Sequence, residues 1–187
     1  MPDSNQIMVG LVSDTHGSID PRVLDALGAC DQIVHAGDVG DASVLRQLNE
    51  AVPALHAVRG NNDPPGNGSG DGMNILEHLP LELRLALPGG ELVVVHGDRV
   101  NPAARRHQRL RVRYPTARAL VYGHSHRLVV DQAEQPWILN PGAAGRARTY
   151  GGPSCLRLII DGPRWQVQTL RFPPRPARSR AQPKAPL

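Results

Sequence analysis

Short apolar runs alternate with polar segments along most of the chain, and their lengths are typical of β-strands. We expect strands near residues 6–13, 32–36, 54–59, 81–87, 91–96, 118–122, 127–131, 136–139, 154–160 and 164–170. The first run is almost entirely apolar, which favours a strand covered on both faces. Pro88-Gly89-Gly90 predicts a hairpin between the fourth and fifth strands.

Helical patterns fall mainly between the early strands. Pro21 is expected to open one short helix, and Ser43 is expected to cap a second. The arginine-rich segment 102–113 has few apolar positions and predicts an exposed helix. A β-α-β-α-β half followed by a strand-rich half predicts an α/β protein in which sheets are flanked by helices.

Length and composition favour one globular domain. The chain has 187 residues, of which 40% are hydrophobic and 20% charged. No apolar stretch reaches the roughly 18–20 residues of a membrane span, and the first six residues lack signal-peptide features. We therefore expect a soluble cytoplasmic protein without a membrane partner. Cys30 and Cys155 are isolated in the sequence and are interpreted as buried, reduced thiols.

The net charge of +4 comes from the C-terminal segment. Residues 172–187 carry four cations and no acid, and the rest of the chain has 17 basic and 17 acidic residues. We predict a domain over 1–171 and a disordered Pro/Arg-rich tail over 172–187. The tail is interpreted as a solvated spacer, with weak nucleic-acid binding as the alternative. Residues 64–72 contain no apolar side chain and predict a flexible loop at a substrate rim.

Several strands end on residues that commonly bind metals. Ligands of open α/β sheets lie just beyond the carboxyl ends of the strands, so these side chains are expected to meet. The candidates are Asp14, His16, Asp38, Asn61, His96, His124 and His126. Asp14 and His16 are two residues apart, as are His124 and His126, and on an extended backbone such pairs point the same way.

The number and type of these donors indicate two metal ions. Seven candidates exceed the needs of one tetrahedral ion, and the mixture of imidazole, carboxylate and amide favours first-row divalent metals. Such a pair attracts phosphate, lowers the pKa of a bridging water and stabilises an in-line displacement. The sequence therefore predicts metal-dependent hydrolysis of a phosphate ester.

The ordered motifs resemble those of the calcineurin-like metallophosphoesterase superfamily, and the chain length resembles its small YfcE-type phosphodiesterases. The motifs are Asp14-Thr15-His16, Gly37-Asp38-Val39-Gly40, Gly60-Asn61-Asn62-Asp63, His96-Gly97-Asp98, Gly123-His124-Ser125-His126 and Asn140-Pro141-Gly142. The resemblance implies a single-domain, four-layer α/β/β/α sandwich. It also implies manganese as the metal, with nickel, iron or zinc as alternatives.

The same resemblance divides the ligands between two ions. One ion would be held by Asp14, His16, Asp38 and His126. The other would be held by Asp38, Asn61, His96 and His124. Asp38 and a hydroxide would bridge the ions, and the hydroxide would attack phosphorus.

The chain departs from the family pattern at two positions. Asn62 stands where many members carry a histidine that can protonate the leaving group, and Ala143 stands where serine is expected. His96 or a metal-bound water is the remaining candidate to assist the leaving oxygen. Asp63 is expected to orient ligands or close a turn.

Other polar residues have two interpretations each. Arg146 and Arg148 could contact a substrate phosphate or lie in a solvated loop. His35 and His56 are expected to be hydrogen-bonded core histidines. The favoured function is a phosphodiesterase acting on a small phosphate ester or nucleotide. The rival is a non-catalytic interaction module, since a retromer subunit has a similar fold and works as a scaffold. Oligomerisation stays open.

Overall fold

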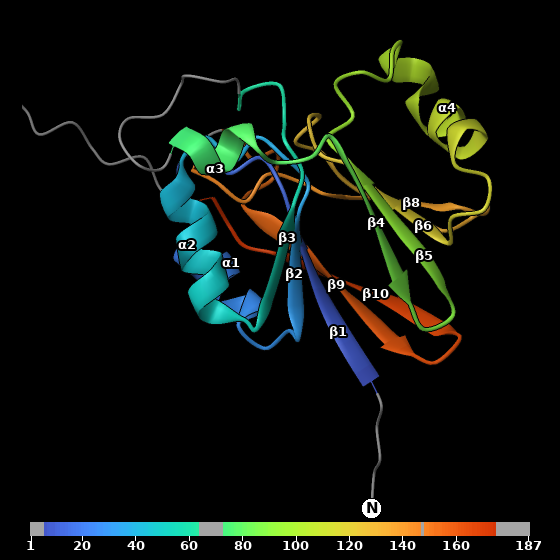
Figure 1. The fold of residues 1–187 in the computed structure, drawn as a ribbon, viewed down its shortest axis with the longest axis horizontal. Coiled ribbons are helices and arrows are strands. Elements are labelled where there is room, and N and C mark those ends of the chain that lie inside the picture. Colours follow the sequence, from blue (N-terminus) through green and yellow to red (C-terminus); the bar gives the residue numbers. More distant parts are fainter. Residues whose placement is uncertain (1–5, 64–72, 147, 175–187) are drawn as a thin grey trace, which may run out of the picture.

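Two five-stranded sheets pack face to face and form the centre of the molecule (Figure 1). The computed structural model describes residues 6–63, 73–146 and 148–174. The first sheet contains β1 (Gln6–Val12), β2 (Gln32–His35), β3 (Ala54–Ala57), β9 (Ser154–Asp161) and β10 (Arg164–Arg171). The second contains β4 (Glu82–Leu87), β5 (Gly90–Val95), β6 (Ala119–Val121), β7 (Leu128–Asp131) and β8 (Trp137–Pro141).

Both sheets mix parallel and antiparallel pairs. The first has the order β10-β9-β1-β2-β3, with β1, β2 and β3 parallel. The second has the order β4-β5-β6-β8-β7, with β5, β6 and β8 parallel and antiparallel strands at both edges. The predicted hairpin between β4 and β5 is confirmed.

Helices cover the outer face of each sheet. On the first sheet lie α1 (Pro21–Leu27), α2 (Ala42–Ala51) and α3 (Met73–Glu77), and on the second lie a 3-10 turn (Ala103–Arg105) and α4 (Arg106–Arg113). The predicted four-layer α/β/β/α sandwich is therefore confirmed, and it forms a single domain.

Three apolar clusters hold the layers together. Leu11, Leu92 and Leu139 are fully buried between the two sheets. Leu27 and Leu48 fasten α1 and α2 to the first sheet, and Leu110 packs α4 against the second. The arginine-rich helix is thus mostly exposed, as expected, but it is anchored by Leu110 and by Arg106, which is also buried.

The layering places the ends of many strands at one end of the sandwich. Within each sheet, the parallel strands run in the same direction, so the loops after β1, β2, β3, β5 and β6 emerge together (Figure 1). Backbone hydrogen bonds join these loops in pairs. The Asp14 amide, after β1, donates to Gly37 O, after β2, and the Gly123 amide, after β6, donates to His96 O, after β5, each over 3.0 Å.

The expectations at the margins of the domain have mixed outcomes. Cys30 and Cys155 are buried and free, as predicted. Phe172 continues from β10 and donates its amide to Pro153 O over 2.9 Å. Residues 175–187 of the predicted tail and the predicted rim loop at 64–72 lie outside the described residues. No helix in the described ranges has the length and apolar character to span a membrane.

The predicted cap of α2 was wrong by two residues. Asp41, not Ser43, is the N-cap: its backbone is extended and its carboxylate accepts the Ser43 amide over 2.8 Å. Hydrogen bonds from Ser43 lower the pKa of the Asp41 carboxyl. Ser43 instead occupies the first turn as a donor.

Replacing the cap should therefore destabilise the fold more than replacing Ser43. We expect Asp41→Ala to lower the free energy of unfolding by about 1 kcal/mol, because a helix amide loses its acceptor. Urea unfolding at neutral pH measures this, with Ser43→Ala as the matched comparison. A larger loss in Ser43→Ala than in Asp41→Ala would contradict the assignment.

Candidate metal centre

An unusual backbone conformation marks the strand-end loops. Six non-glycine residues in the described chain have a left-handed φ, and five of them are predicted ligands. They are Asp14 (54°), His16 (46°), Asp38 (55°), His124 (63°), His126 (55°) and Arg148 (54°). This region is unfavourable for residues with a Cβ, and such residues cluster at functional sites. The paired ligands therefore converge through left-handed turns, and the extended backbone assumed from the sequence is wrong.

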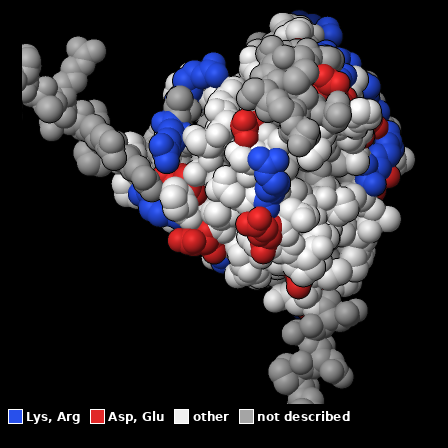
Figure 2. Space-filling view, turned by 60° about the vertical axis from the view of Figure 1, so that its left-hand side comes forward, with Lys and Arg blue, Asp and Glu red and all other residues white. Residues whose placement is uncertain are grey.

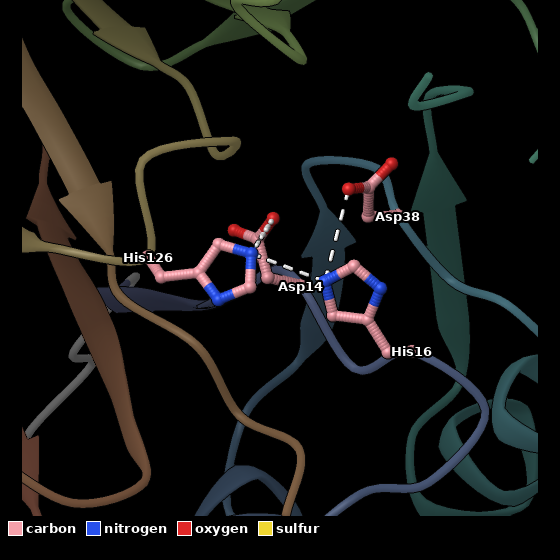
Figure 3. Close-up of side chains that lie close together, drawn as sticks. All are labelled: Asp14, His16, Asp38 and His126. Atoms are coloured by element: carbon pink, nitrogen blue, oxygen red, sulfur yellow. Dashed lines mark hydrogen bonds and ion pairs between the residues drawn. The ribbon is translucent and has the colours of Figure 1, made fainter. Parts of the chain in front are cut away.

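Four of the predicted ligands form one compact group. One donor atom from each of Asp14, His16, Asp38 and His126 lies within 4.8 Å of all the others (Figure 3). The Nε2 atoms of His16 and His126 are 3.1 Å apart. Asp14 Oδ1 is 3.4 Å from His126 Nε2, and Asp38 Oδ2 is 3.8 Å from His16 Nε2. Such a set of imidazoles and carboxylates could hold a divalent ion.

The remaining predicted ligands form a second group on the other side of Asp38. Its Oδ1 is 3.2 Å from His96 Nε2. Asn61 Oδ1 is 3.2 Å from the same nitrogen and 2.9 Å from His124 Nδ1. The structure therefore brings together all seven side chains, and Asp38 faces both groups with different oxygens.

Backbone carbonyls orient two of the imidazoles. His96 Nδ1 lies 2.8 Å from Ala36 O, and His126 Nδ1 lies 3.2 Å from Arg148 O. A carbonyl only accepts, so the proton of each ring is fixed on Nδ1 and Nε2 is directed into the site. Orientation of a ligating histidine by its second nitrogen is typical of metal centres. The ring orientations thus fit a metal at both groups.

Asn62 and Asp63, which follow Asn61 in the chain, fix the position of Asp38 and its loop. Asn62 donates its amide to Asp38 Oδ1 over 2.8 Å and its side-chain nitrogen to Oδ2 over 2.6 Å. Asp63 is buried and accepts the amides of Val39, Gly40 and Gly60 over 2.7–3.1 Å. Asp63 therefore ties the loop after β2 to the loop after β3.

Two glycines are required by close approach. A Cβ on Gly60 would collide with the backbone and carboxylate of Asp38. A Cβ on Gly37, whose φ is 92°, would lie 2.6 Å from His96 Nδ1. The loops that carry the donors can reach each other only because these positions lack side chains.

Burial sets the charge state of the metal-free site. It raises the pKa of Asp14 to about 7, although hydrogen bonds from Ser13 and the His124 amide oppose it. It also lowers the pKa of His16, His124 and His126. Burial alone would raise the pKa of Asp38, but bonds from His96 and Asn62 outweigh it and lower the value. Burial alone would lower the pKa of His96, but Asp38 outweighs it and raises the value.

The two predicted substrate-binding arginines lie in different surroundings. Both are exposed, and Arg148 Nη2 lies 3.2 Å from His16 Nε2, beside the first donor group. Within the described residues, no hydrogen bond or ion pair joins Arg146 to any of the seven predicted ligands. The position of Ala143, where serine was expected, is buried and its carbonyl accepts the Ser154 amide over 3.2 Å.

Two residues in the sequence motifs shape the site through contacts that the sequence did not predict. Thr15 lies between two donors, and its hydroxyl contacts His35 Nε2 and Val39 O, each over 3.0 Å. Asn140 is fully buried and donates to Gly123 O and Ser125 Oγ, which holds the loop of His124 and His126. The Asn140-Pro141-Gly142 motif was the available signal, but nothing local to it names these partners.

Comparison with known proteins shows the family of the chain. Residues 7–162 match the family model described as the calcineurin-like phosphoesterase superfamily domain. The chain belongs to this superfamily. A curated relative, a "probable metallophosphoesterase" of Methanocaldococcus jannaschii, is 29% identical over 143 residues, which cover 73% of this chain and 68% of the relative.

Among solved structures, proteins of different names share the fold. A novel archaeal phosphodiesterase has a TM-score of 0.65 at 18% identity, covering 88% of this chain and all of its own. Wild-type Vps29 from Entamoeba histolytica, solved with Zn²⁺, has a TM-score of 0.69 at 18% identity, covering 89% of this chain and 99% of its own. At these identities the likeness concerns the fold alone.

The predicted core histidine beneath the site is confirmed. His35 is fully buried, accepts the Gly37 amide at Nδ1 over 3.2 Å, and contacts Thr15 through Nε2. Burial lowers the pKa of His35 to about 3. The second expected core histidine, His56, is half-buried.

This buried imidazole should make stability depend on pH. Between pH 6.5 and 3 the unfolded chain protonates His35 while the folded chain does not, so its contribution is complete above 6.5 and falls as the pH is lowered. At its steepest, the free energy of unfolding falls by about 1.4 kcal/mol for each pH unit. We expect the stability gap between metal-free wild type and His35→Asn to narrow from pH 7 to 5. Urea unfolding measures the gap, and a constant gap would contradict the neutral buried state.

Proposed function

We propose that the protein is a metal-dependent phosphodiesterase that uses two divalent ions. The observation that supports this most is the pair of donor groups joined through the two oxygens of Asp38. One ion would be held by Asp14, His16, Asp38 and His126, and the other by Asp38, Asn61, His96 and His124. Mn²⁺ is our first choice, with Ni²⁺, Fe²⁺ and Zn²⁺ as alternatives.

The metals would carry the main chemistry. Bound ions would activate the attacking water and neutralise charge on the phosphate during in-line displacement at phosphorus. The chain's own residues position this chemistry. Asn62 and Asp63 hold Asp38 and its loop through the hydrogen bonds described above. Their role is therefore to position ligands, and the Asn62 amide has no acidic proton to give.

The proton for the leaving oxygen has two candidate sources, His96 and water. His96 Nδ1 is engaged by Ala36 O, and its Nε2 faces Asp38 and Asn61. If Nε2 binds an ion, His96 has no proton to transfer. We therefore propose that His96 acts as a ligand and that water at the exposed Asn61–Asn62 edge protonates the leaving group.

Arg148 is our proposed phosphate-binding residue. Its guanidinium lies beside His16 Nε2, whose lone pair an ion would take up. The guanidinium would then be available for a phosphate oxygen, with which it can form charge-assisted hydrogen bonds. Arg146 is exposed nearby and is proposed to add a weaker, longer-range attraction.

Other partners have less support. A non-catalytic scaffold on this fold would not need all seven donors, and all seven are present and brought together. Lys and Arg side chains lie beside Asp and Glu on the face shown in Figure 2, so that face offers no feature specific to nucleic acid. We propose a small phosphodiester or nucleotide as the substrate.

Metal removal and loss of the shared carboxylate should abolish turnover. We expect chelator-treated protein to be inactive on aryl phosphodiesters and Mn²⁺ to restore activity. Asp38→Asn should lower kcat/KM at least about a hundredfold, because replacing a ligand exceeds the 10–100-fold cost of losing a residue that orients one. Asp25→Asn, on the exposed face of α1, is the matched control. Metal content and initial rates are measured. Turnover that persists in both the stripped protein and Asp38→Asn would refute the proposal.

The two arginines should have unequal effects. We expect Arg148→Gln to raise KM roughly tenfold, the scale of one charge-assisted hydrogen bond, with a smaller change for Arg146→Gln. Steady-state kinetics with a phosphodiester measures both variants under saturating metal. Equal effects, or a larger one in Arg146→Gln, would reject Arg148 as the phosphate contact.

A further inference from the structure

A small cavity lies directly beside the second donor group. Its volume is about 140 Å³, and His96 forms part of its wall. It lies where the end of β5 and the start of β4 meet the C-terminal end of α4, and it is partly open to solvent. Arg59, two residues before the donor Asn61, forms another wall. The cavity therefore adjoins the second donor group through His96.

The walls combine an apolar surface with charged groups. Leu81, Val100 and Tyr114 supply apolar and aromatic surface. Around them stand three guanidinium groups and two carboxylates, those of Arg59, Arg99, Arg113, Glu82 and Asp98. Cations therefore outnumber anions by one.

The acidic side chains of the cavity already have partners. Glu82 accepts the Tyr114 hydroxyl over 2.6 Å and pairs with Arg84 and Arg113 at 2.9 and 3.7 Å. Asp98 lies 3.8 Å from Arg99, whose side chain is 62% exposed. Each carboxylate thus has a cationic partner, and the one guanidinium in excess gives the cavity a net positive charge that favours an anionic ligand.

The size of the cavity limits what it can hold. Cavities of about 150 Å³ accept a single benzene ring, whereas sites for drug-sized ligands begin at about 300 Å³. The cavity therefore has room for one ring or a group of similar size. A larger group such as a nucleoside would extend beyond it.

We propose that this cavity binds one ester arm of the phosphodiester, and that the preferred arm is one ring in size and carries a negative charge. The inference rests on the proposed function, and it names the substrate class at that same site. An arm bound here would extend from the phosphate past His96 between Arg59 and Arg99. The cavity then selects arms by size, and its guanidinium groups select them by charge.

The size selection is tested with two esters that differ by one fused ring. These are methyl 4-nitrophenyl phosphate and methyl 4-nitro-1-naphthyl phosphate, assayed with the Mn²⁺-loaded full chain. Leu81 lies at the rim and is 39% exposed, so it can be changed with little risk to the fold. We expect Leu81→Ala to shift the kcat/KM ratio roughly tenfold toward the naphthyl ester, and Leu81→Trp to shift this ratio away from the naphthyl ester.

The two esters differ in intrinsic reactivity, but this difference is the same for every variant. It therefore cancels when the kcat/KM ratio of a variant is compared with that of the wild type. Val112→Ala and Val112→Trp are the matched controls, since Val112 is 75% exposed on α4 and does not line the cavity. Both controls should keep the wild-type ratio.

The charge selection is tested with two inhibitors. Methyl phenylphosphonates that carry a 4-carboxylate or a 4-aminomethyl group cannot lose the ring by ester hydrolysis. The carboxylate should bind more tightly, and Arg99→Gln should reduce that preference roughly two- to fivefold, the range of an exposed ion pair. Arg164→Gln, on exposed β10, should leave the preference unchanged.

The possible outcomes separate this inference from the proposed function. If the wild type hydrolyses the esters and neither Leu81 variant changes the kcat/KM ratio of the two esters, the assignment of the cavity is overturned. The proposal that the protein is a phosphodiesterase is then unaffected. A preference for the ammonium inhibitor would overturn the charge assignment. Absence of wild-type turnover with every metal tried would overturn the proposed function and this inference with it.

Discussion

The site depends on how the carboxylate of Asp38 is held. Its two oxygens face different donor groups, so a small rotation of this side chain would disrupt both. Asn62 bonds to both oxygens, Asp63 joins the neighbouring loops, and Gly60 leaves the space that the carboxylate occupies. The loops after β2 and β3 are therefore fixed to each other through buried polar contacts, and β1 and β5 bring their own donors to that fixed point.

Much of the fold could be predicted because strand positions depend on local sequence. Apolar runs located all ten strands within one or two residues of their observed ends. The order of strands could not be predicted in the same way, because β8 lies between β6 and β7 through contacts distant in sequence. The α2 cap was wrong for a local reason: Asp41 and Ser43 are both good caps, and only the backbone angles distinguish them.

The donor residues were predicted from their place at strand ends, but their convergence has a different physical cause. An extended backbone would turn Asp14 and His16 to one side, whereas the structure uses a left-handed turn at each. Glycine neighbours gave a partial signal of tight turns. Thr15 and Asn140 stand in the motifs of the sequence, but their roles could not be predicted because their partners lie 15–24 residues away along the chain.

The cost of this arrangement bears on whether the centre is catalytic. Left-handed φ at five donors and a fully buried Asp14 are each unfavourable for folding, by about 1–3 kcal/mol for each strained backbone position. Glycine at those positions would relieve the backbone strain, and a scaffold that only presents a surface would lose nothing by it. A metal centre, in contrast, needs the side chains in this geometry and recovers the cost when ions bind. The strained and complete donor set is therefore better explained by metal binding than by a surface that binds no ion.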